Sequence, residues 1–241
     1  MQQAYKKLKP YAVASQVAYR LIHSRFPPIA LFDDVADEAE FEALYQVQAL
    51  TNPRLLAEAG NASLLPTKQI PFGITGCSYA VAPFTHVNPD GSRFSDGSYG
   101  VLYLADEMQT ALLEVQHHQQ LYWQNVPDLK FERFVFRGLK VEFSVPKEPP
   151  VEHGLSAIHF NDNHPIYNAN DYSAARSLGR EIKQQKPLAT LHYKAVRRVS
   201  ATCWALFSPK HVASVKQSQH YEMVWDTKKI SIARLTQVTQ I

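Results

Sequence analysis

The strongest constraint on the fold is a short apolar run followed at once by a helical pattern. The run, VLYLA at 101–105, is bounded by Gly100 and Asp106, and its length and composition predict a buried strand. In the next segment the apolar residues repeat with the i, i+3, i+4, i+7 spacing of one helix face: Met108, Ala111, Leu112 and Val115. We expect Asp106 to cap this helix, with Gln109 completing a capping box.

Other segments indicate further strands and helices. The stretch VAYRLI at 17–22 predicts a strand with Arg20 at its centre. Residues 33–50 predict a helix, because an Asp pair begins the segment and a proline follows its end. Residues 130–146 predict two strands joined around the Arg-Gly pair at 137–138.

The C-terminal half adds a second helix and closing strands. Residues 170–185 place apolar side chains on one helix face, and the segments ATLHYKAV, TCWALFS and YEMVW are typical of strands. Because helices and strands do not alternate regularly, we expect an α+β fold with a mixed sheet core and an N-terminal helical extension. We expect one domain over 1–241, with a tail at 1–16, an extension packing on the core at 17–90, and core motifs at 91–225.

Composition narrows the possible partners and location. The chain is 45% hydrophobic and 20% charged, and its net charge of +3 is too small to indicate nucleic-acid binding without a clustered patch. Cys77 and Cys203 lie far apart, without metal-ligand spacing. No stretch approaches the roughly 18 apolar residues of a membrane span, and the N-terminus lacks the apolar segment of a secretory signal. We therefore expect a cytoplasmic protein with no membrane or direct nucleic-acid partner.

Four residues are candidates for a binding or catalytic site. Arg93 lies in the Gly- and Ser-rich stretch GSRFSDGSYG and is either a surface turn residue or a ligand for phosphate or carboxylate. Arg20, in an apolar strand, points to solvent or to an anion. Tyr103 is either a core aromatic or a ring that stacks on a heterocycle. Glu114 lies on the flank of the predicted helix, with His118 four residues later, and a solvated pair is the plain alternative.

Other chemistries lack their motifs. The patterns H-E-x-x-H and C-x-x-C are absent, and the polar stretch at 159–164 is interpreted as a loop rather than a metal site. No G-x-G-x-x-G follows a predicted strand, and there is no Walker loop and no G-x-S-x-G elbow. We expect no bound metal and no cofactor.

In their order and spacing, these segments resemble the RES-domain family. The run RFSDGSYGVLYLADEMQTALLEV resembles the family signature of an Arg, an aromatic residue, a loop, a strand carrying Tyr and a helix carrying Glu. The upstream segments YRLIHSRFPPIALFDDVAD, TNPRL and FTHVNPDGSRFSDG resemble the longer branch of the family. The segment LHYKAVRRVSATCWALFSP resembles its last motif, so the similarity runs from about Val17 to Trp225.

The resemblance implies an NAD-consuming toxin of a bacterial toxin–antitoxin pair. Family members cleave the bond between nicotinamide and ribose, as NAD phosphorylases or NAD glycohydrolases, with NAD as substrate and inorganic phosphate as a possible co-substrate. The fold would resemble that of ADP-ribosyltransferase toxins. The partner would be an antitoxin with a helix-turn-helix domain that covers the cleft.

The same resemblance assigns roles to the four candidates. Arg93 and Arg20 would hold phosphates of NAD, and Tyr103 would pack against a ring of the dinucleotide. Glu114 would accept hydrogen bonds from the nicotinamide ribose and stabilise the oxocarbenium-like state as the glycosidic bond breaks. Arg93 and Glu114 are the expected catalytic residues, and Arg20 and Tyr103 the expected substrate-binding residues.

One position departs from the family pattern. The family serine falls in a Tyr-x-Ser-x-Arg motif, which here runs from Tyr193 to Arg197 with Ala195 in the place of the serine. A lost hydrogen bond to a charged group costs about 1.5–3 kcal/mol, which predicts a slower enzyme. Two alternatives stay open: transfer of ADP-ribose to a cellular protein, and a non-catalytic member that binds NAD or a partner.

Overall fold

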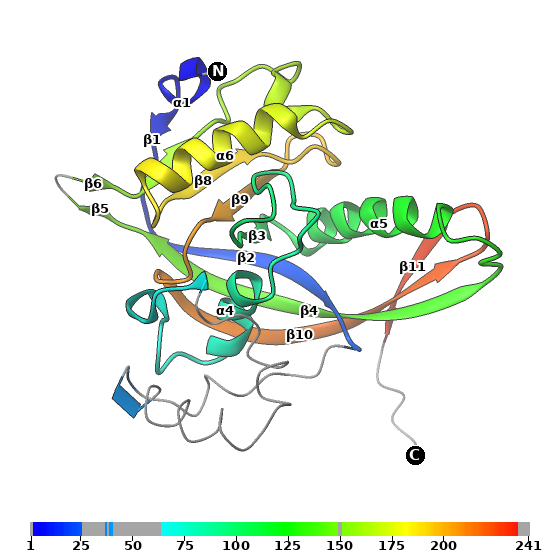
Figure 1. Ribbon diagram of the computed structural model, residues 1–241. Helices are drawn as coiled ribbons and strands as arrows, with labels where there is room; N and C mark the ends of the chain where they lie inside the picture. Colours follow the sequence, from blue (N-terminus) through cyan, green and yellow to red (C-terminus); the bar gives the residue numbers. More distant parts are fainter. Residues whose placement is uncertain (1, 26–36, 38, 41–63, 149–150, 236–241) are drawn as a thin grey trace.

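The structure is organised around one large mixed sheet. The computed structural model describes residues 2–25, 37, 39–40, 64–148 and 151–235. Within them, nine strands lie in the order β1-β7-β8-β9-β3-β2-β4-β10-β11 (Figure 1). These strands are β1 Lys9–Pro10, β2 Val13–His23, β3 Leu102–Ala105, β4 Glu132–Val145, β7 Gly154–Ser156, β8 Thr190–Lys194, β9 Thr202–Leu206, β10 Val212–Trp225 and β11 Ile230–Leu235. β5 Lys147–Glu148 pairs separately with β6 Val151–Glu152.

Strand direction makes the sheet mixed. β7 and β8 pair in parallel, whereas β8 with β9, β9 with β3, and β2 with β4 pair antiparallel. The chain passes from β7 to β8 through the helix α6 (Ser173–Gln185), because parallel neighbours need a crossover connection. The predicted α+β class with a mixed sheet is confirmed.

Helices cover both faces of the sheet. α5 (Met108–Gln124) and α6 lie on one face, and α4 (Cys77–Thr85) lies on the other (Figure 1). α1 (Gln2–Tyr5) contacts α6, and the chain also forms two short 3₁₀ turns, η2 (Thr67–Gln69) and η3 (Pro165–Tyr167).

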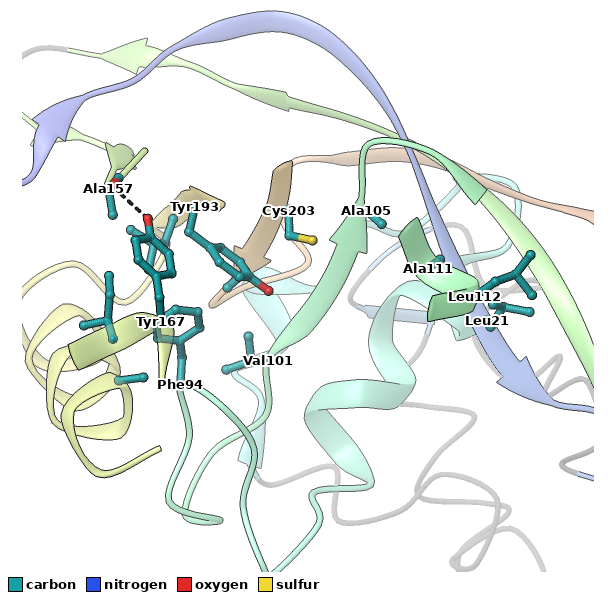
Figure 2. Packing of buried hydrophobic residues seen from close by; sticks show 14 of the residues in the cluster. Leu21, Phe94, Val101, Ala105, Ala111, Leu112, Ala157, Tyr167, Tyr193 and Cys203 are labelled. Carbon is teal, nitrogen blue, oxygen red and sulfur yellow. Dashed lines mark hydrogen bonds between the residues drawn. The ribbon is translucent and has the colours of Figure 1, made fainter. Parts of the chain in front are cut away.

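Each face of the sheet buries its own apolar cluster. Along β9, Cys203 and Ala205 belong to the cluster under α5 and α6, whereas Trp204 and Leu206 belong to the cluster under α4. This alternation follows from the two-residue period of a strand. Figure 2 shows part of the first cluster, with Tyr193 and Cys203 extending from the neighbouring strands β8 and β9.

Several sequence predictions hold. The run at 101–105 forms β3, the amphipathic segment after it forms α5, and 170–185 contains α6. The segment 17–22 lies within β2, which pairs with both β3 and β4. Part of the predicted extension is therefore an interior strand of the sheet, while the division of the chain into one domain stays a prediction.

Two local predictions are wrong. The segment predicted at 130–146 forms one continuous strand, β4 (Glu132–Val145), rather than two strands around Gly138. Gly138 is needed for close packing, since an added Cβ would lie 2.9 Å from the backbone carbonyl oxygen of Gln219 and 2.6 Å from Ser218 Oγ. At α5 the N-cap position is Glu107, and no side-chain cap forms there.

Asp106 anchors the start of α5 in a different way. Its Oδ1 accepts a hydrogen bond from Thr110 Oγ1 at 2.6 Å, and its Oδ2 accepts one from the backbone N–H of Thr202 at 2.8 Å. The carboxylate thus ties the first turn of α5 to β9. The helix predicted at 33–50 lies largely outside the described residues.

Candidate functional site

The four candidate residues line one cavity. A cavity of about 430 Å³ lies between β2, β3, the loop before β3, and α5. We call it the Arg93 cavity, and its walls are Tyr19, Arg20, Leu21, Asn88, Gly91, Ser92, Arg93, Tyr103, Leu104, Ala105, Ala111, Glu114, Val115, His118, Tyr172, Tyr193 and Cys203. Arg20, Arg93, Tyr103 and Glu114 all occur in this lining. Its volume falls within the roughly 300–1,000 Å³ of small-molecule sites.

Arg93 is buried, yet one of the two terminal nitrogens of its guanidinium has no hydrogen-bond partner among the described residues. Its Nη1 donates to the carbonyl oxygens of Ile166 at 3.1 Å and Asn168 at 2.9 Å. Its Nη2 is buried without a hydrogen-bond partner among the described residues. The guanidinium carbon lies 4.4 Å from the centre of the Tyr172 ring, in a cation–π contact. A buried cation with a free donor at a cavity is suited to an anionic ligand.

Helix α6 holds the loop that carries Arg93, between α4 and β3 (residues 86–101), which we call the Arg93 loop. Arg176 donates from Nε to the Ser92 carbonyl at 3.0 Å and from Nη2 to the Asp90 carbonyl at 2.8 Å. Arg180 forms an ion pair with Asp96 at 2.8 Å.

Gly179 lies on the same side of α6 as Arg176 and lets the helix approach the Arg93 loop closely. A Cβ added at Gly179 would lie 1.9 Å from the carbonyl oxygen of Phe94. The position of Arg93 is therefore fixed by the packing of a rigid helix, as a binding residue requires.

Tyr103 contributes through its hydroxyl as well as its ring. The hydroxyl accepts a hydrogen bond from the backbone N–H of Phe94 at 2.9 Å and is hydrogen-bonded to Ser92 Oγ at 2.7 Å. Burial raises the pKa of Tyr103 to about 12, so the phenol stays protonated. Tyr103 therefore fixes the Arg93 loop and also presents its ring to the cavity.

Glu114 is oriented by the loop between β8 and β9. Its Oε1 accepts a hydrogen bond from the backbone N–H of Val196 at 3.3 Å. Arg198 of the same loop pairs with Glu107 at 2.7 Å and donates to Thr110 at 2.9 Å. Arg197 donates to the carbonyl oxygen of Ala169 at 2.7 Å and is hydrogen-bonded to His117 Nε2 at 2.6 Å. The loop is thus attached to α5 on both sides of the carboxylate.

Arg20 faces the cavity rather than open solvent. Its guanidinium forms no hydrogen bond or ion pair with the residues that the structure describes. Desolvation lowers its pKa to about 10, which leaves it cationic at neutral pH. Of the alternatives left by the sequence, an anion is favoured, because a desolvated cation without a partner is unfavourable.

Tyr193, Cys203 and His118, which also line the cavity, have pKa values shifted in favour of their neutral forms. Burial raises the pKa of Tyr193 and of the Cys203 thiol. Desolvation, assisted by the charges of Arg197 and Arg93, lowers the pKa of His118. The cavity therefore combines two cations, one carboxylate and neutral aromatic walls.

Ala195 lies on a second cavity. This cavity of about 500 Å³, which we call the Ala195 cavity, is lined by Ile158, Asp162, Tyr167, Lys194, Ala195, Val196, Arg198, Val199, Ser200, Ala201 and Thr202. Ala195 does not occur in the described lining of the Arg93 cavity. The backbone N–H of Val196, next in sequence, is the group that reaches Glu114.

Neither Tyr172 nor Tyr193 was among the site residues predicted from the sequence. Tyr193 lies on β8, and its register partner is Cys203 on β9, so both belong to the same face of the sheet. The two-residue spacing of Leu191 and Tyr193 along a predicted strand could have indicated that Tyr193 points to the buried face of the sheet. Tyr172 occupies the N-cap position of α6, and only the tertiary structure brings it to Arg93.

The described residues contain no group of three or more His, Cys, Asp or Glu side chains that could hold a metal ion. None of the helices in the described part of the chain is long and apolar enough to cross a membrane.

Comparison with known proteins identifies a family and a similar protein. The model of the RES domain matches residues 70–226, which include the loop of Arg93, β3, α5 and the strands β8 to β10. The chain is 29% identical over 220 residues to the uncharacterized protein y4oC of Sinorhizobium fredii, and the match covers 89% of this chain and 85% of the relative.

Proposed function

The chain belongs to the RES-domain family, and on this premise we propose that it consumes NAD by cleaving the bond between nicotinamide and ribose. The observation that carries the proposal is the grouping of Arg20, Arg93 and Glu114 around one cavity with tyrosine walls. NAD matches this grouping in each of its parts. It has a pyrophosphate for the two guanidinium groups, flat rings for the tyrosines, and a ribose that becomes positively charged beside a carboxylate.

In this proposal the two arginines bind the pyrophosphate of NAD, and the tyrosines orient its rings. Nη2 of Arg93 and the guanidinium of Arg20 donate to the pyrophosphate, which supplies the partner that both lack among the described residues. The rings of Tyr103 and Tyr193 offer flat surfaces at which a base or nicotinamide ring can pack. Tyr172 stays on the guanidinium of Arg93 and limits its freedom.

Glu114 accelerates bond cleavage by electrostatics. As the glycosidic bond breaks, its electron pair moves to the nicotinamide nitrogen and positive charge develops on the ribose. A carboxylate held in place beside the ribose stabilises that charge without reorganisation. The hydrogen bond from Val196 holds one oxygen of Glu114, which leaves the other oxygen for a ribose hydroxyl. Nicotinamide departs neutral, so the step requires no general acid.

Membership of the RES-domain family also supports a proposal for the biological role of the protein. We propose that NAD depletion makes the protein a growth-arresting toxin acting in the cytoplasm. We further propose that its partner is an antitoxin with a helix-turn-helix domain, and that its core resembles the fold of ADP-ribosyltransferase toxins. The family match supports these proposals at the level of the family only.

Incubation of the purified protein with NAD tests the proposal. We expect nicotinamide to be released, together with ADP-ribose or, in the presence of phosphate, a phosphorylated ADP-ribose, identified by mass spectrometry. A parallel reaction with adenine-labelled NAD and a bacterial lysate detects label on a protein band, which would instead support ADP-ribosyl transfer. Tight NAD binding without any product would contradict the proposal and favour a non-catalytic member.

A further inference from the structure

We propose that His118 is the general base of this reaction and that the acceptor it activates is water. The inference rests on the proposed cleavage of NAD and deepens it, since it selects one acceptor among phosphate, water and a protein side chain. Its basis is the position of a free imidazole on the same wall of the Arg93 cavity as the carboxylate Glu114.

Helix geometry places His118 beside Glu114. The two residues are four apart on α5 and both line the Arg93 cavity. Side chains at i and i+4 on a helix have Cβ atoms about 5–6 Å apart. A water molecule bound between the two side chains would therefore lie next to the ribose carbon that Glu114 stabilises.

The ring nitrogens of His118 are free to bind such a water. His118 lies on the wall of the cavity, and its imidazole forms no hydrogen bond with the residues that the structure describes. The neighbouring His117 differs, because its Nε2 is already bonded to Arg197 at 2.6 Å. The two rings contact each other with centroids 5.6 Å apart. His117 therefore holds the loop between β8 and β9, whereas the imidazole of His118 remains available to bind water.

The charges around His118 keep it neutral and so able to accept a proton. Desolvation, and after it the positive charges of Arg197 and Arg93 on two different loops, lower the pKa of His118. The other charged or titratable groups that line the Arg93 cavity are Tyr19 and Arg20 of β2, Tyr103 of β3, Tyr193 of β8, Cys203 of β9, Tyr172 before α6, and Glu114 of its own helix, and His117 lies beside it on that helix. Cations outnumber carboxylates in this set, which disfavours the imidazolium at neutral pH.

The reaction balances with His118 as proton acceptor. The bond between the ribose carbon and the nicotinamide nitrogen breaks, and its electron pair neutralises the pyridinium. The water oxygen forms the new bond to the ribose carbon, and one water proton passes to a ring nitrogen of His118 and then to solvent. NAD and water give ADP-ribose, nicotinamide and a proton.

A general base accelerates attack by water more than attack by phosphate. Inorganic phosphate already carries a nucleophilic oxyanion at neutral pH and gains little from a base. Water must lose a proton as it attacks, and a positioned base is worth about 10²–10⁴-fold for such a step. A neutral histidine beside Glu114 therefore favours hydrolysis.

The test compares the wild type with His118→Gln between pH 5 and 9, with and without phosphate. His220→Gln, on β10 and outside the described lining of the Arg93 cavity, is the matched control. We expect ADP-ribose as the main product of the wild type even with phosphate present, with a rate that declines at acid pH as His118 becomes protonated. His118→Gln should hydrolyse NAD about 100-fold more slowly and lose this acid decline, while its affinity for NAD and its melting temperature stay unchanged.

The outcomes separate this inference from the proposed function. If the wild type consumes NAD and His118→Gln keeps the wild-type rate and pH profile, the inference is wrong and the proposed function stands. Phosphorylated ADP-ribose or a labelled protein as the main product would also overturn the choice of water. If neither the wild type nor any variant consumes NAD, the proposed function fails and the inference fails with it.

Discussion

Glu114 Oε1 accepts a hydrogen bond from the backbone N–H of Val196 at 3.3 Å, which joins α5 to the loop between β8 and β9. The family pattern places a serine hydroxyl one residue earlier, where this chain has Ala195. A main-chain donor therefore holds the carboxylate without help from a side chain at position 195. Because the donor belongs to the backbone, side-chain substitution in the loop leaves it available.

This arrangement predicts a small effect of Ala195→Ser on turnover. Ala195 lines the Ala195 cavity and not the described wall of the Arg93 cavity, so a new hydroxyl would not contact NAD. We expect a change in the rate of NAD consumption well below the ten- to hundredfold that a new hydrogen bond to a charged group would give. A rise of that size on adding the hydroxyl would show instead that position 195 belongs to the substrate site. Steady-state kinetics of the two proteins measures the difference.

Arg20→Gln should weaken NAD binding without destabilising the fold. The guanidinium of Arg20 has no hydrogen-bond partner among the described residues, so its removal breaks no structural contact. Loss of a charge-assisted hydrogen bond costs about 1.5–3 kcal/mol, or roughly 10- to 100-fold in affinity. Calorimetric titration with NAD, with Arg20→Lys as the charge-conserving control, measures it. Unchanged affinity in Arg20→Gln would remove Arg20 from the site.

Gly179→Ala should destabilise the protein and displace the Arg93 loop. The new Cβ would meet the carbonyl oxygen of Phe94 at 1.9 Å, a backbone atom that cannot move without the loop. Overpacking of this kind costs about 1–3 kcal/mol. Thermal unfolding should show a lower Tm and NAD titration a weaker affinity, whereas Gln184→Ala on the exposed side of α6 should change neither. A Gly179→Ala protein as stable as the wild type would contradict the close packing of α6 on this loop.

Stability should fall in mild acid because of His192. Its ring stacks on Trp204 with centroids 5.1 Å apart, and neither ring nitrogen has a partner among the described residues. Burial lowers its pKa to about 4, from an unfolded value of 6.5. The unfolded chain therefore binds the proton first, so this contribution to stability is complete above pH 6.5 and is lost as the pH falls toward 4.

The His192 contribution amounts to at most about 3 kcal/mol over that range. Urea unfolding at pH 7.5 and 4.5 measures it, with His192→Phe as the variant that keeps an aromatic ring on Trp204. We expect the loss of stability between the two pH values to be smaller in His192→Phe than in the wild type. An equal loss in both proteins would assign the acid sensitivity to other groups.

The sequence predicted those parts of the fold that local patterns determine. The strand at 101–105, α5 and α6 have apolar residues at the spacing of a strand or of one helix face, and each formed as expected. Gly138 was mistaken for a turn because its role is to let the backbone of Gln219, which is distant in sequence, pack closely against β4. Asp106 was mistaken for a helix cap because its second partner, Thr202, belongs to another strand.

The candidate site, like the fold, could be predicted from the sequence only in part. Arg20, Arg93, Tyr103 and Glu114 could be selected from the sequence by the chemistry of their side chains and by their spacing. Their placement around one cavity depends on tertiary contacts, such as those of Arg176 and Gly179 with the Arg93 loop, which no local pattern encodes. The second cavity at Ala195 and the contact of Tyr172 with Arg93 are known only from the structure.

The most direct test of the central claim is the rate of nicotinamide release from NAD by the wild type and by Glu114→Gln. Glutamine retains an oxygen that can accept the Val196 hydrogen bond, so the fold and the Tm should not change, while the negative charge is lost. We predict steady release by the wild type and by the control Glu181→Gln on α6, and a rate at least about 100-fold lower in Glu114→Gln. Equal rates in the wild type and Glu114→Gln, or no release by either, would contradict the account.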